Sequence, residues 1–133
     1  MTTDAEAYLR KARENLASAE ADLSAGRLNS AASRAYYAAF QAAVAALIER
    51  GISPRGESWD HKFVISEFSG KLIRRRRVVS GRLTGTLDVL LQRRLRADYR
   101  PAALGRREAS DSSRKATEFV QQLEIRLKER RPA

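Results

Sequence analysis

The most reactive combination of side chains in the sequence lies in one short run, "RRLRADYR", at residues 93–100. Arg94 and Asp98 are four residues apart, the spacing of neighbours on one face of a helix, so we expect them to form an ion pair. A guanidinium held in this way can contact two oxygens of a phosphate. Tyr99 follows directly and can donate a hydrogen bond or a proton to the same group. The alternative is a salt-bridged helix end with a capping tyrosine.

His61 is the other candidate for proton transfer. It is the single histidine of the chain, and histidine is the side chain whose unperturbed pKa lies nearest to neutral pH. The alternative is a structural role in which His61 anchors the third helix. With one histidine, no carboxylate cluster around it and no cysteine, the sequence predicts no metal site and excludes thiol catalysis. It has no glycine-rich phosphate loop, so we expect no cofactor.

Positive charge is concentrated in one part of the chain. Residues 71–107 contain twelve basic and two acidic side chains, which accounts for the whole net charge of +10. Such a patch is typical of proteins that bind phosphate backbones, and arginine favours bidentate contacts. We therefore expect RNA or single-stranded nucleic acid as a partner; a solvated arginine face and an acidic protein partner are the alternatives. The candidate nucleic-acid-binding residues are Arg74, Arg75, Arg76, Arg77, Arg93, Arg96 and Arg100.

The composition predicts an all-α protein that would position these residues. Three prolines and seven glycines in 133 residues, together with abundant alanine and leucine, favour helices over strands. Hydrophobic residues make up 43% of the chain, which is enough for a core. We find no internal repeat or linker, so we expect one domain over residues 1–133, with a loose basic tail at 128–133. Its architecture should be an up-and-down bundle of four to five helices.

Apolar residues at helical spacing, together with capping residues, define five expected helices. The segments at 52–57 and 101–110 are expected loops, and 69–81 is ambiguous between a frayed helix end and a connection. The expected N-caps, in chain order, are Thr3 with Glu6, then Asn29 or Ser30, then Ser58, then Ser110. Helix ends are expected at Gly26, Gly51 and Pro101. The fourth helix is marked by Leu83, Leu87, Leu90, Leu91 and Leu95.

The second helix has the most distinctive pattern, "SRAYYAAFQAAVAAL", at residues 33–47. Arg34 and Tyr37 lie on one stripe of this helix, and Tyr36 and Phe40 lie on another. Its alanines permit the close approach of a neighbouring helix. Arg34 and Tyr37 are candidates for binding; the alternative is that both tyrosines pack in a core and Arg34 pairs with an acid.

Taken together, these stretches resemble the HEPN family, most closely its small stand-alone bacterial and archaeal members. The family pattern runs R-x-Y-Y-A-x-F-x-A in the second helix, then a histidine-containing step, then R-x-x-A-D-Y, then A-x-x-F-V in the last helix. The resemblance covers nearly the whole chain. The matching residues are Arg34, Tyr36, Tyr37, Ala38, Phe40, Ala42, His61, Arg94, Ala97, Asp98, Tyr99, Ala116, Phe119 and Val120.

The resemblance implies a four- or five-helix bundle that usually forms a dimer. Many HEPN proteins are metal-independent endoribonucleases, either toxins paired with a nucleotidyltransferase antitoxin or effectors of antiviral defence. Their usual signature is R-x(4–6)-H near the start of the late helix, and two copies face each other across the dimer. In such a centre the arginine holds the scissile phosphate and the histidine moves a proton.

This sequence departs from that signature. If Arg94 takes the arginine position, Tyr99 stands where histidine is expected; an alternative overlay places Ala97 there. One hypothesis is therefore a variant, metal-independent endoribonuclease. A second is a non-catalytic subunit that binds RNA or a partner such as a nucleotidyltransferase or a defence complex. A third is a nucleotide-binding regulator. The catalytic candidates are Arg94, Asp98, Tyr99 and His61.

The sequence gives no sign of membrane targeting. Its longest apolar stretch, "AAFQAAVAALI", is too short to span a bilayer. The start, "MTTDAEAYLRKARENL", is acidic and amphipathic, unlike a signal peptide. We therefore expect no membrane association and a cytoplasmic location.

Overall fold

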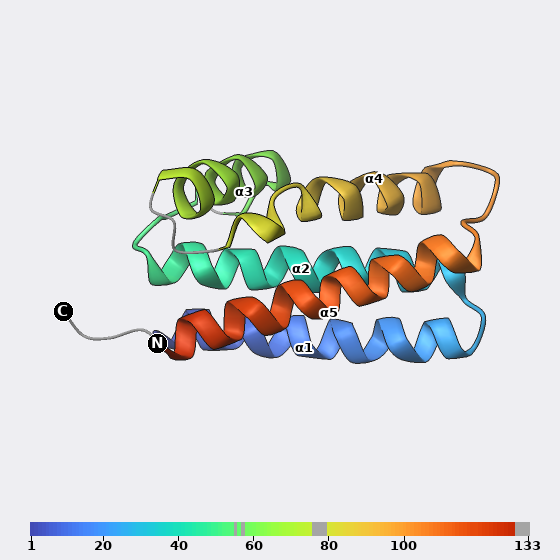
Figure 1. Cartoon of the computed structure of the whole chain (residues 1–133), viewed down its shortest axis with the longest axis horizontal. Helices are drawn as coiled ribbons and strands as arrows, with labels where there is room; N and C mark the ends of the chain where they lie inside the picture. The colour runs from blue at the N-terminus through green and yellow to red at the C-terminus, as the bar shows by residue number, and fades with distance from the viewer. Residues whose placement is uncertain (55, 57, 76–79, 130–133) are drawn as a thin grey trace.

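The computed structural model describes residues 1–54, 56, 58–75 and 80–129, and all regular structure within them is helical (Figure 1). The long helices α1, α2, α4 and α5 alternate in direction along the bundle, as an up-and-down arrangement requires. The expected all-α bundle is confirmed. The elements are α1 (Thr3–Ser24), α2 (Leu28–Glu49), α3 (His61–Glu67), the π-helix η1 (Phe68–Arg75), the 3-10 helix η2 (Gly81–Leu83), α4 (Thr86–Tyr99) and α5 (Arg106–Lys128).

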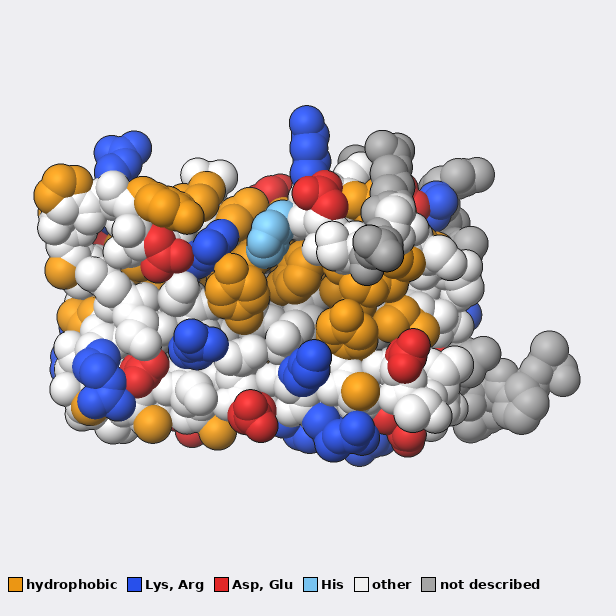
Figure 2. Space-filling model, turned by 180° about the vertical axis from the view of Figure 1, so that it is seen from behind, with side chains coloured by type: hydrophobic (Ala, Val, Ile, Leu, Met, Phe, Trp, Pro, Cys, Tyr) orange, Lys and Arg blue, Asp and Glu red, His pale blue; other side chains and the backbone are white. Residues whose placement is uncertain are grey.

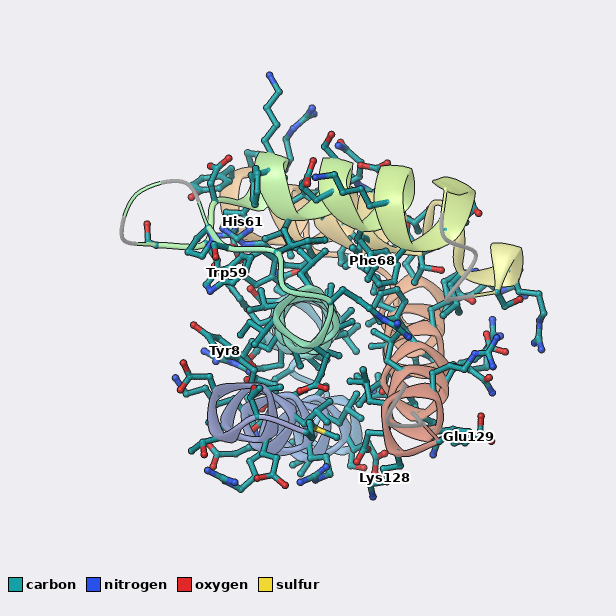
Figure 3. The ribbon with its side chains drawn as sticks, turned by 90° about the vertical axis from the view of Figure 1, so that its left-hand side faces the viewer. Tyr8, Trp59, His61, Phe68, Lys128 and Glu129 are labelled. Carbon is teal, nitrogen blue, oxygen red and sulfur yellow. The ribbon has the colours of Figure 1, made fainter. Side chains whose placement is uncertain are left out.

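Helix α2 lies at the centre of the bundle. It contacts α1, α5, α4 and α3, and thirteen of its residues are buried, nine of which are alanine. In the end-on view of Figure 3, α1 lies below α2, α5 lies to one side, and α3 with η1 lies above. Small side chains let the backbones of these helices approach closely, so the alanines of α2 are covered within the chain itself.

The segment from α3 through η1 closes one side of the core. Val64, Phe68 and Leu72 are buried, and the rings of Phe68 and Phe119 lie 5.2 Å apart. The ambiguous stretch at 69–81 begins as the π-helix η1, and part of it, residues 76–79, lies outside the described residues. Leu83 belongs to η2, so α4 begins later than expected, after Gly85, whose φ of 80° lies in the left-handed region.

The predicted N-caps of α1, α2 and α3 are wrong. Thr2 rather than Thr3 caps α1, because the Thr2 side chain accepts a hydrogen bond from the backbone N–H of Ala5. Asp60 rather than Ser58 caps α3 by accepting from the backbone N–H of Phe63. Helix α2 has no side-chain cap. Asn29 and Ser30, the predicted caps, instead form longer-range bonds: the Asn29 side chain accepts from Leu104, and the Ser30 hydroxyl donates to Asp22.

The start of α5 is also earlier than predicted. The helix begins at Arg106, after Gly105, so Ser110 lies within the helix and does not cap it. Buried Leu104 holds the preceding turn, and Glu108 places an acidic side chain in the first helical turn, where the helix dipole favours it. The predicted ends at Gly26, Gly51 and Pro101 agree with helices that stop at Ser24, Glu49 and Tyr99. Residues 130–133 of the predicted basic tail lie outside the described residues.

In the part of the chain that the structure describes, no helix is long and apolar enough to cross a bilayer.

The packing of Phe119 in the core gives a first prediction. Phe119 is completely buried, whereas Ile125 on the same helix is 48% exposed. We expect Phe119→Ala to lower the free energy of unfolding by about 3–5 kcal/mol, because it removes apolar contacts and leaves a cavity. The matched control Ile125→Ala should change it by less than about 0.5 kcal/mol. Urea denaturation measures both values, and equal losses would contradict this description of the core.

Candidate functional site

Three aromatic side chains of α2 surround His61, the first residue of α3. Tyr36 is completely buried, and its hydroxyl lies 2.7 Å from Nδ1 of His61. The His61 ring lies 4.7 Å from the ring of Phe40 and 6.1 Å from that of Tyr37, measured between centroids. The sequence positions these rings locally, because Tyr36, Tyr37 and Phe40 all fall on the side of α2 that faces the start of α3. The orientation of the imidazole is therefore fixed by several contacts.

Arg94 of α4 reaches the same aromatic group from another direction. Its guanidinium lies 5.1 Å from the centroid of the Tyr37 ring, within the range of a cation–π contact. Its Nε donates to Asp98 over 3.0 Å, so the predicted ion pair at this spacing is present. The Ser33 hydroxyl lies 3.3 Å from Asp98 and adds a second contact to that carboxylate. We call His61, Tyr36, Tyr37, Arg94 and Asp98 the His61–Arg94 centre.

The His61–Arg94 centre lies at the surface. Figure 2 shows the histidine side chain, in pale blue, accessible from outside and bordered by hydrophobic side chains, with charged side chains close by. Figure 3 shows Trp59 and His61 on the same side of α2 as Tyr8 of α1. Arg94 and Asp98 keep 16% and 31% of their side-chain area exposed. A ligand from solvent can therefore reach the centre without any change in the fold.

Tyr99 does not join this centre. It is 72% exposed at the last position of α4, and it makes no hydrogen bond or ring contact with any described residue. Five residues after Arg94, it is turned by about 140° around the helix, so the two side chains do not share a face. The structure thus brings together Arg94, Asp98 and His61 among the predicted catalytic residues and leaves Tyr99 apart.

The comparisons with known proteins decide the family. A model of the HEPN domain matches residues 5–126 of the chain. The chain belongs to the HEPN family. Its members include RNA-targeting nucleases and partner domains. No curated protein matches this sequence. The position of the late-helix histidine in the HEPN signature is occupied by Tyr99 or Ala97, depending on the overlay, whereas the histidine of this HEPN chain belongs to α3 and lies beside the same Tyr37 ring as Arg94.

In the second-helix motif of this HEPN chain, some side chains lie in the core and others lie at the surface. Tyr36 is buried and Tyr37 is half-buried, so the predicted packing role applies fully only to Tyr36. Arg34 is exposed and donates a hydrogen bond to the side-chain oxygen of Asn15 over 3.3 Å. Asn15 in turn donates to Gln41 over 2.8 Å. Within the described part of the chain, Arg34 is therefore hydrogen-bonded to an amide of α1 and not to an acid, which the packing alternative assumed.

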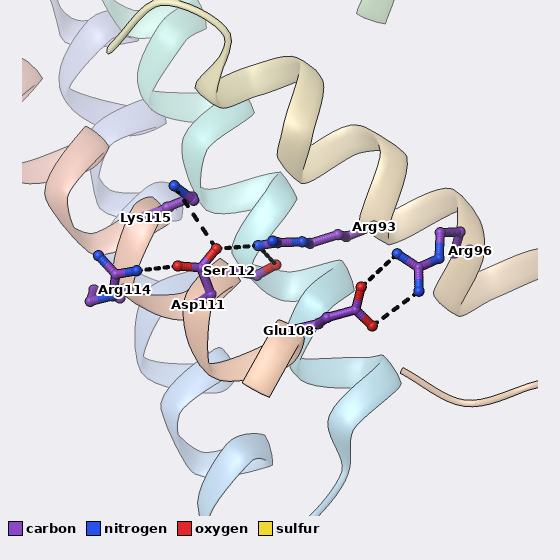
Figure 4. A network of polar contacts seen from close by, with 7 residues as sticks. All are labelled: Arg93, Arg96, Glu108, Asp111, Ser112, Arg114 and Lys115. Carbon is purple, nitrogen blue, oxygen red and sulfur yellow. Dashed lines mark hydrogen bonds and ion pairs between the residues drawn. The ribbon is translucent and has the colours of Figure 1, made fainter. Parts of the chain in front are cut away.

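Two of the predicted nucleic-acid-binding arginines link α4 to α5 (Figure 4). Arg93 donates to Asp111 over 2.6 Å and to the buried Ser112 over 3.3 Å. Arg96 contacts both carboxylate oxygens of Glu108, at 2.7 and 3.0 Å. Hydrogen bonding to Arg96 holds the pKa of the Glu108 carboxyl below its usual range. These two side chains thus already have acidic partners within the chain.

Of the other predicted nucleic-acid-binding arginines, Arg100 is the one whose side chain the structure describes. Arg100 is exposed directly after α4 and makes no ion pair with a described residue. The backbone of Arg74 and Arg75 belongs to η1, but their side chains, and the whole of Arg76 and Arg77, lie outside the described residues. The contribution of these four residues to nucleic-acid binding stays a prediction.

The environment of His61 favours its neutral form. Burial lowers the pKa of its imidazole below the ordinary value of 6.5, and the positive charge of Arg94 lowers it further, while Asp60 opposes both effects. Burial also raises the pKa of the Tyr36 hydroxyl. Both groups are therefore uncharged at neutral pH. The described residues contain no group of three or more histidine, cysteine, aspartate or glutamate side chains that could hold a metal ion.

The sequence predicted no role for Ser33, and for Tyr36 it gave only the alternative of packing in the core. Tyr36 and Phe40 are both buried, but the hydrogen-bond partner of Tyr36 comes from 25 residues away. A usable signal was present: a buried tyrosine hydroxyl needs a hydrogen-bond partner, and His61 was the one histidine available.

The lowered pKa of His61 makes stability depend on pH. The unfolded chain, with an ordinary pKa of 6.5, binds more protons than the folded chain below that value. The contribution of His61 to stability is thus fully present above pH 6.5 and is lost as the pH falls through the folded-state pKa. Urea denaturation at pH 7.5, 6.5 and 5.5 should show this decrease. In His61→Gln the decrease over this range should be smaller; an identical pH dependence in both proteins would contradict the proposed burial effect.

Proposed function

We propose that this HEPN protein is a metal-independent endoribonuclease whose variant active site is the His61–Arg94 centre. The observation that carries the proposal is the meeting of His61 and Arg94 at the ring of Tyr37, from two different helices. An arginine and a histidine are the pair that the HEPN signature normally supplies from one helix. Here α3 supplies the histidine that α4 lacks.

Arg94 is suited to hold the phosphate. Its Nε donates to Asp98, and neither Nη1 nor Nη2 forms a hydrogen bond with another described residue. Two N–H-bearing nitrogens of a permanently charged group are thus free to contact two phosphate oxygens. Asp98 and the Tyr37 ring restrict the guanidinium, so less conformational entropy is lost when the phosphate binds.

The reaction needs no component beyond the RNA. The ribose 2′-oxygen attacks phosphorus and loses its proton, the bond from phosphorus to the 5′-oxygen breaks, and that oxygen gains a proton. The products are a 2′,3′-cyclic phosphate and a 5′-hydroxyl. Arg94 would neutralise the charge that grows on the phosphate, and the imidazole of His61, which is uncharged at neutral pH, would contact the reacting group from its place beside the Tyr37 ring.

Tyr99 and Arg100 are proposed as RNA contacts outside the reacting phosphate. The exposed ring of Tyr99 can stack on a base, and the exposed charge of Arg100 can meet the backbone. We further propose that the protein acts as a dimer in a toxin or antiviral-defence setting, with a nucleotidyltransferase or a defence complex as partner. Membership of the HEPN family supports that setting. The buried alanines of α2 do not add support, because helices of the same chain cover them.

The second candidate function is a non-catalytic HEPN subunit that binds RNA. Two observations favour it: the histidine position of the late helix holds Tyr99 or Ala97, and Nδ1 of His61 is already engaged by Tyr36. Such a subunit would use the same arginines but would leave RNA intact.

Cleavage assays distinguish the two functions. A short single-stranded RNA should be cut in excess EDTA and should carry a 2′,3′-cyclic phosphate at the new end. Arg94→Ala should lower kcat/KM by about 10²–10³-fold, because it removes the charge that stabilises the transition state. His61→Gln should lower it by about 10²-fold or more. The matched control Arg10→Ala, which removes an exposed arginine of α1 that lies outside the centre, should cut at close to the wild-type rate.

Folding of the variants is checked by thermal denaturation, and Arg94→Lys provides a second test. Lysine keeps the charge at position 94 but cannot place two parallel donors, so it should fold and remain impaired in cleavage. Wild-type protein that binds RNA without cutting it would favour the non-catalytic subunit. Full activity in Arg94→Ala would exclude this centre as the active site.

Binding should depend strongly on salt. Each phosphate that a basic residue neutralises adds about 0.7 to the slope of log K against log salt for a single strand. If all four arginines at 74–77 contact phosphates, changing them to glutamate should reduce that slope by about 3. Fluorescence anisotropy with a labelled RNA measures it. A control with the same change in net charge, but placed on α1 and α5, replaces the exposed residues Arg10, Arg114, Arg126 and Lys128. Equal loss of binding in both variants would contradict a localised patch.

A further inference from the structure

The hydrogen bond between Tyr36 and His61 determines which imidazole nitrogen carries the proton. The Tyr36 hydroxyl is completely buried, and Nδ1 of His61, 2.7 Å away, is its one hydrogen-bond partner among the described residues. A hydroxyl and an imidazole nitrogen can share a hydrogen bond in two ways, since each of them can act as donor or as acceptor. The two arrangements present different chemistry to solvent.

In one arrangement Nδ1 carries the proton and donates to the tyrosine oxygen. The tyrosine proton would then have no acceptor among the described residues, in a site closed to water. An unsatisfied buried donor is unfavourable. In the other arrangement Tyr36 donates to an unprotonated Nδ1, and both groups are satisfied. The second arrangement is therefore favoured, and it leaves the proton of the neutral imidazole on Nε2.

The Nε2 atom is available to a ligand. It has no hydrogen-bond partner in the described part of the chain, and it is not among the buried polar atoms there that lack one. Figure 2 shows the histidine side chain at the surface. The ring also packs against Phe40 and Tyr37, and with Nδ1 bonded to Tyr36 it is Nε2 that remains for a ligand.

We propose that Tyr36 is a positioning residue that holds His61 as the neutral Nε2–H tautomer, so that His61 and Arg94 together present hydrogen-bond donors to one phosphate group. This inference rests on the proposed function in taking RNA as the source of the phosphate. It deepens that function by assigning His61 to the phosphate side of the reaction. A nitrogen that already carries a proton cannot accept the one that leaves the 2′-hydroxyl, so that proton passes to solvent water. The Nε2–H group instead donates a hydrogen bond to the phosphate and stabilises the charge that grows there.

The tautomer can be measured directly, because the chain contains a single histidine. Long-range proton–nitrogen correlation NMR on the full-length, nitrogen-15-labelled protein at pH 7.5 separates protonated from unprotonated imidazole nitrogens. We expect Nε2 to have the shift of a protonated nitrogen and Nδ1 that of an unprotonated acceptor. A protonated Nδ1 in the wild type would overturn the proposal, and this result requires no variant to fold.

Two tyrosine variants test the role of Tyr36 itself. Tyr36→Phe keeps the ring but removes the hydroxyl, so the two nitrogen shifts should move toward an average of both tautomers. The control Tyr37→Phe removes the neighbouring hydroxyl and should leave them unchanged. Wild-type shifts in Tyr36→Phe would show that Tyr36 does not position the imidazole.

These outcomes are separable from the proposed function, because the spectra are recorded without RNA. Protonated Nε2 in a protein that never cuts RNA would overturn the nuclease proposal and leave this inference standing. Protonated Nδ1 in a protein that does cut RNA would overturn this inference and leave the nuclease proposal standing. The unprotonated Nε2 of His61 would then be able to act as the base.

Discussion

The close packing of neighbouring helices against the alanine side chains of α2 is the constraint on which the rest of this structure depends. Nine buried alanines let α1, α4 and α5 approach the α2 backbone, so α2 becomes the element that all the other long helices share. Between these alanines, α2 also carries large aromatic side chains. Tyr36, Tyr37 and Phe40 form such a group, and they face α3 and α4 rather than α1. The position of the His61–Arg94 centre thus follows from where the alanine pattern of α2 is interrupted.

Helix α4 is held by a different combination of forces. Only Leu87, Leu90 and Ala97 of this helix are buried, which is a small apolar contribution for fourteen residues. Arg93 and Arg96 add ion pairs to Asp111 and Glu108 of α5. The pair of Arg96 is well exposed and contributes little to stability, whereas that of Arg93 is more enclosed. These pairs fix the rotation of α4 about its axis, and that rotation turns Arg94 toward Tyr37.

The same ion pairs reduce the positive charge that the basic segment, residues 71–107, can offer to a nucleic acid. Counted along the sequence, residues 71–107 carry the whole net charge of the protein. Folding places Asp111 and Glu108, which lie outside that segment, against two of its arginines. The charge available to a nucleic acid at this end of α4 is therefore smaller than the sequence suggests. Arg94 and Arg100 differ from their neighbours in this respect, because neither pairs with an acid of α5 among the described residues.

A structural feature could be predicted from the sequence when the residues that form it lie close together in the chain. The bundle and the Arg94–Asp98 pair are set by spacings of three and four residues, so both could be predicted. Helix starts were less accessible, because serine, threonine, asparagine and aspartate cluster near each one and only tertiary contacts select among them. Thr2 replaced Thr3 and Asp60 replaced Ser58 for this reason. The contact of His61 with Tyr36 could not be predicted from spacing, since a loop of unknown path separates them.

The most direct test of a shared phosphate site is a titration of the full-length protein with a short single-stranded RNA whose 2′-hydroxyls are methylated, which prevents cleavage. The imidazole signals of His61 report on the centre without interference from other histidines. They should shift in a saturable way in the wild type and in Arg100→Ala, and the RNA affinity reported by His61 should fall at least about tenfold in Arg94→Ala, the loss of one charge-assisted contact. RNA that saturates the protein while the His61 signals stay unchanged would contradict the account.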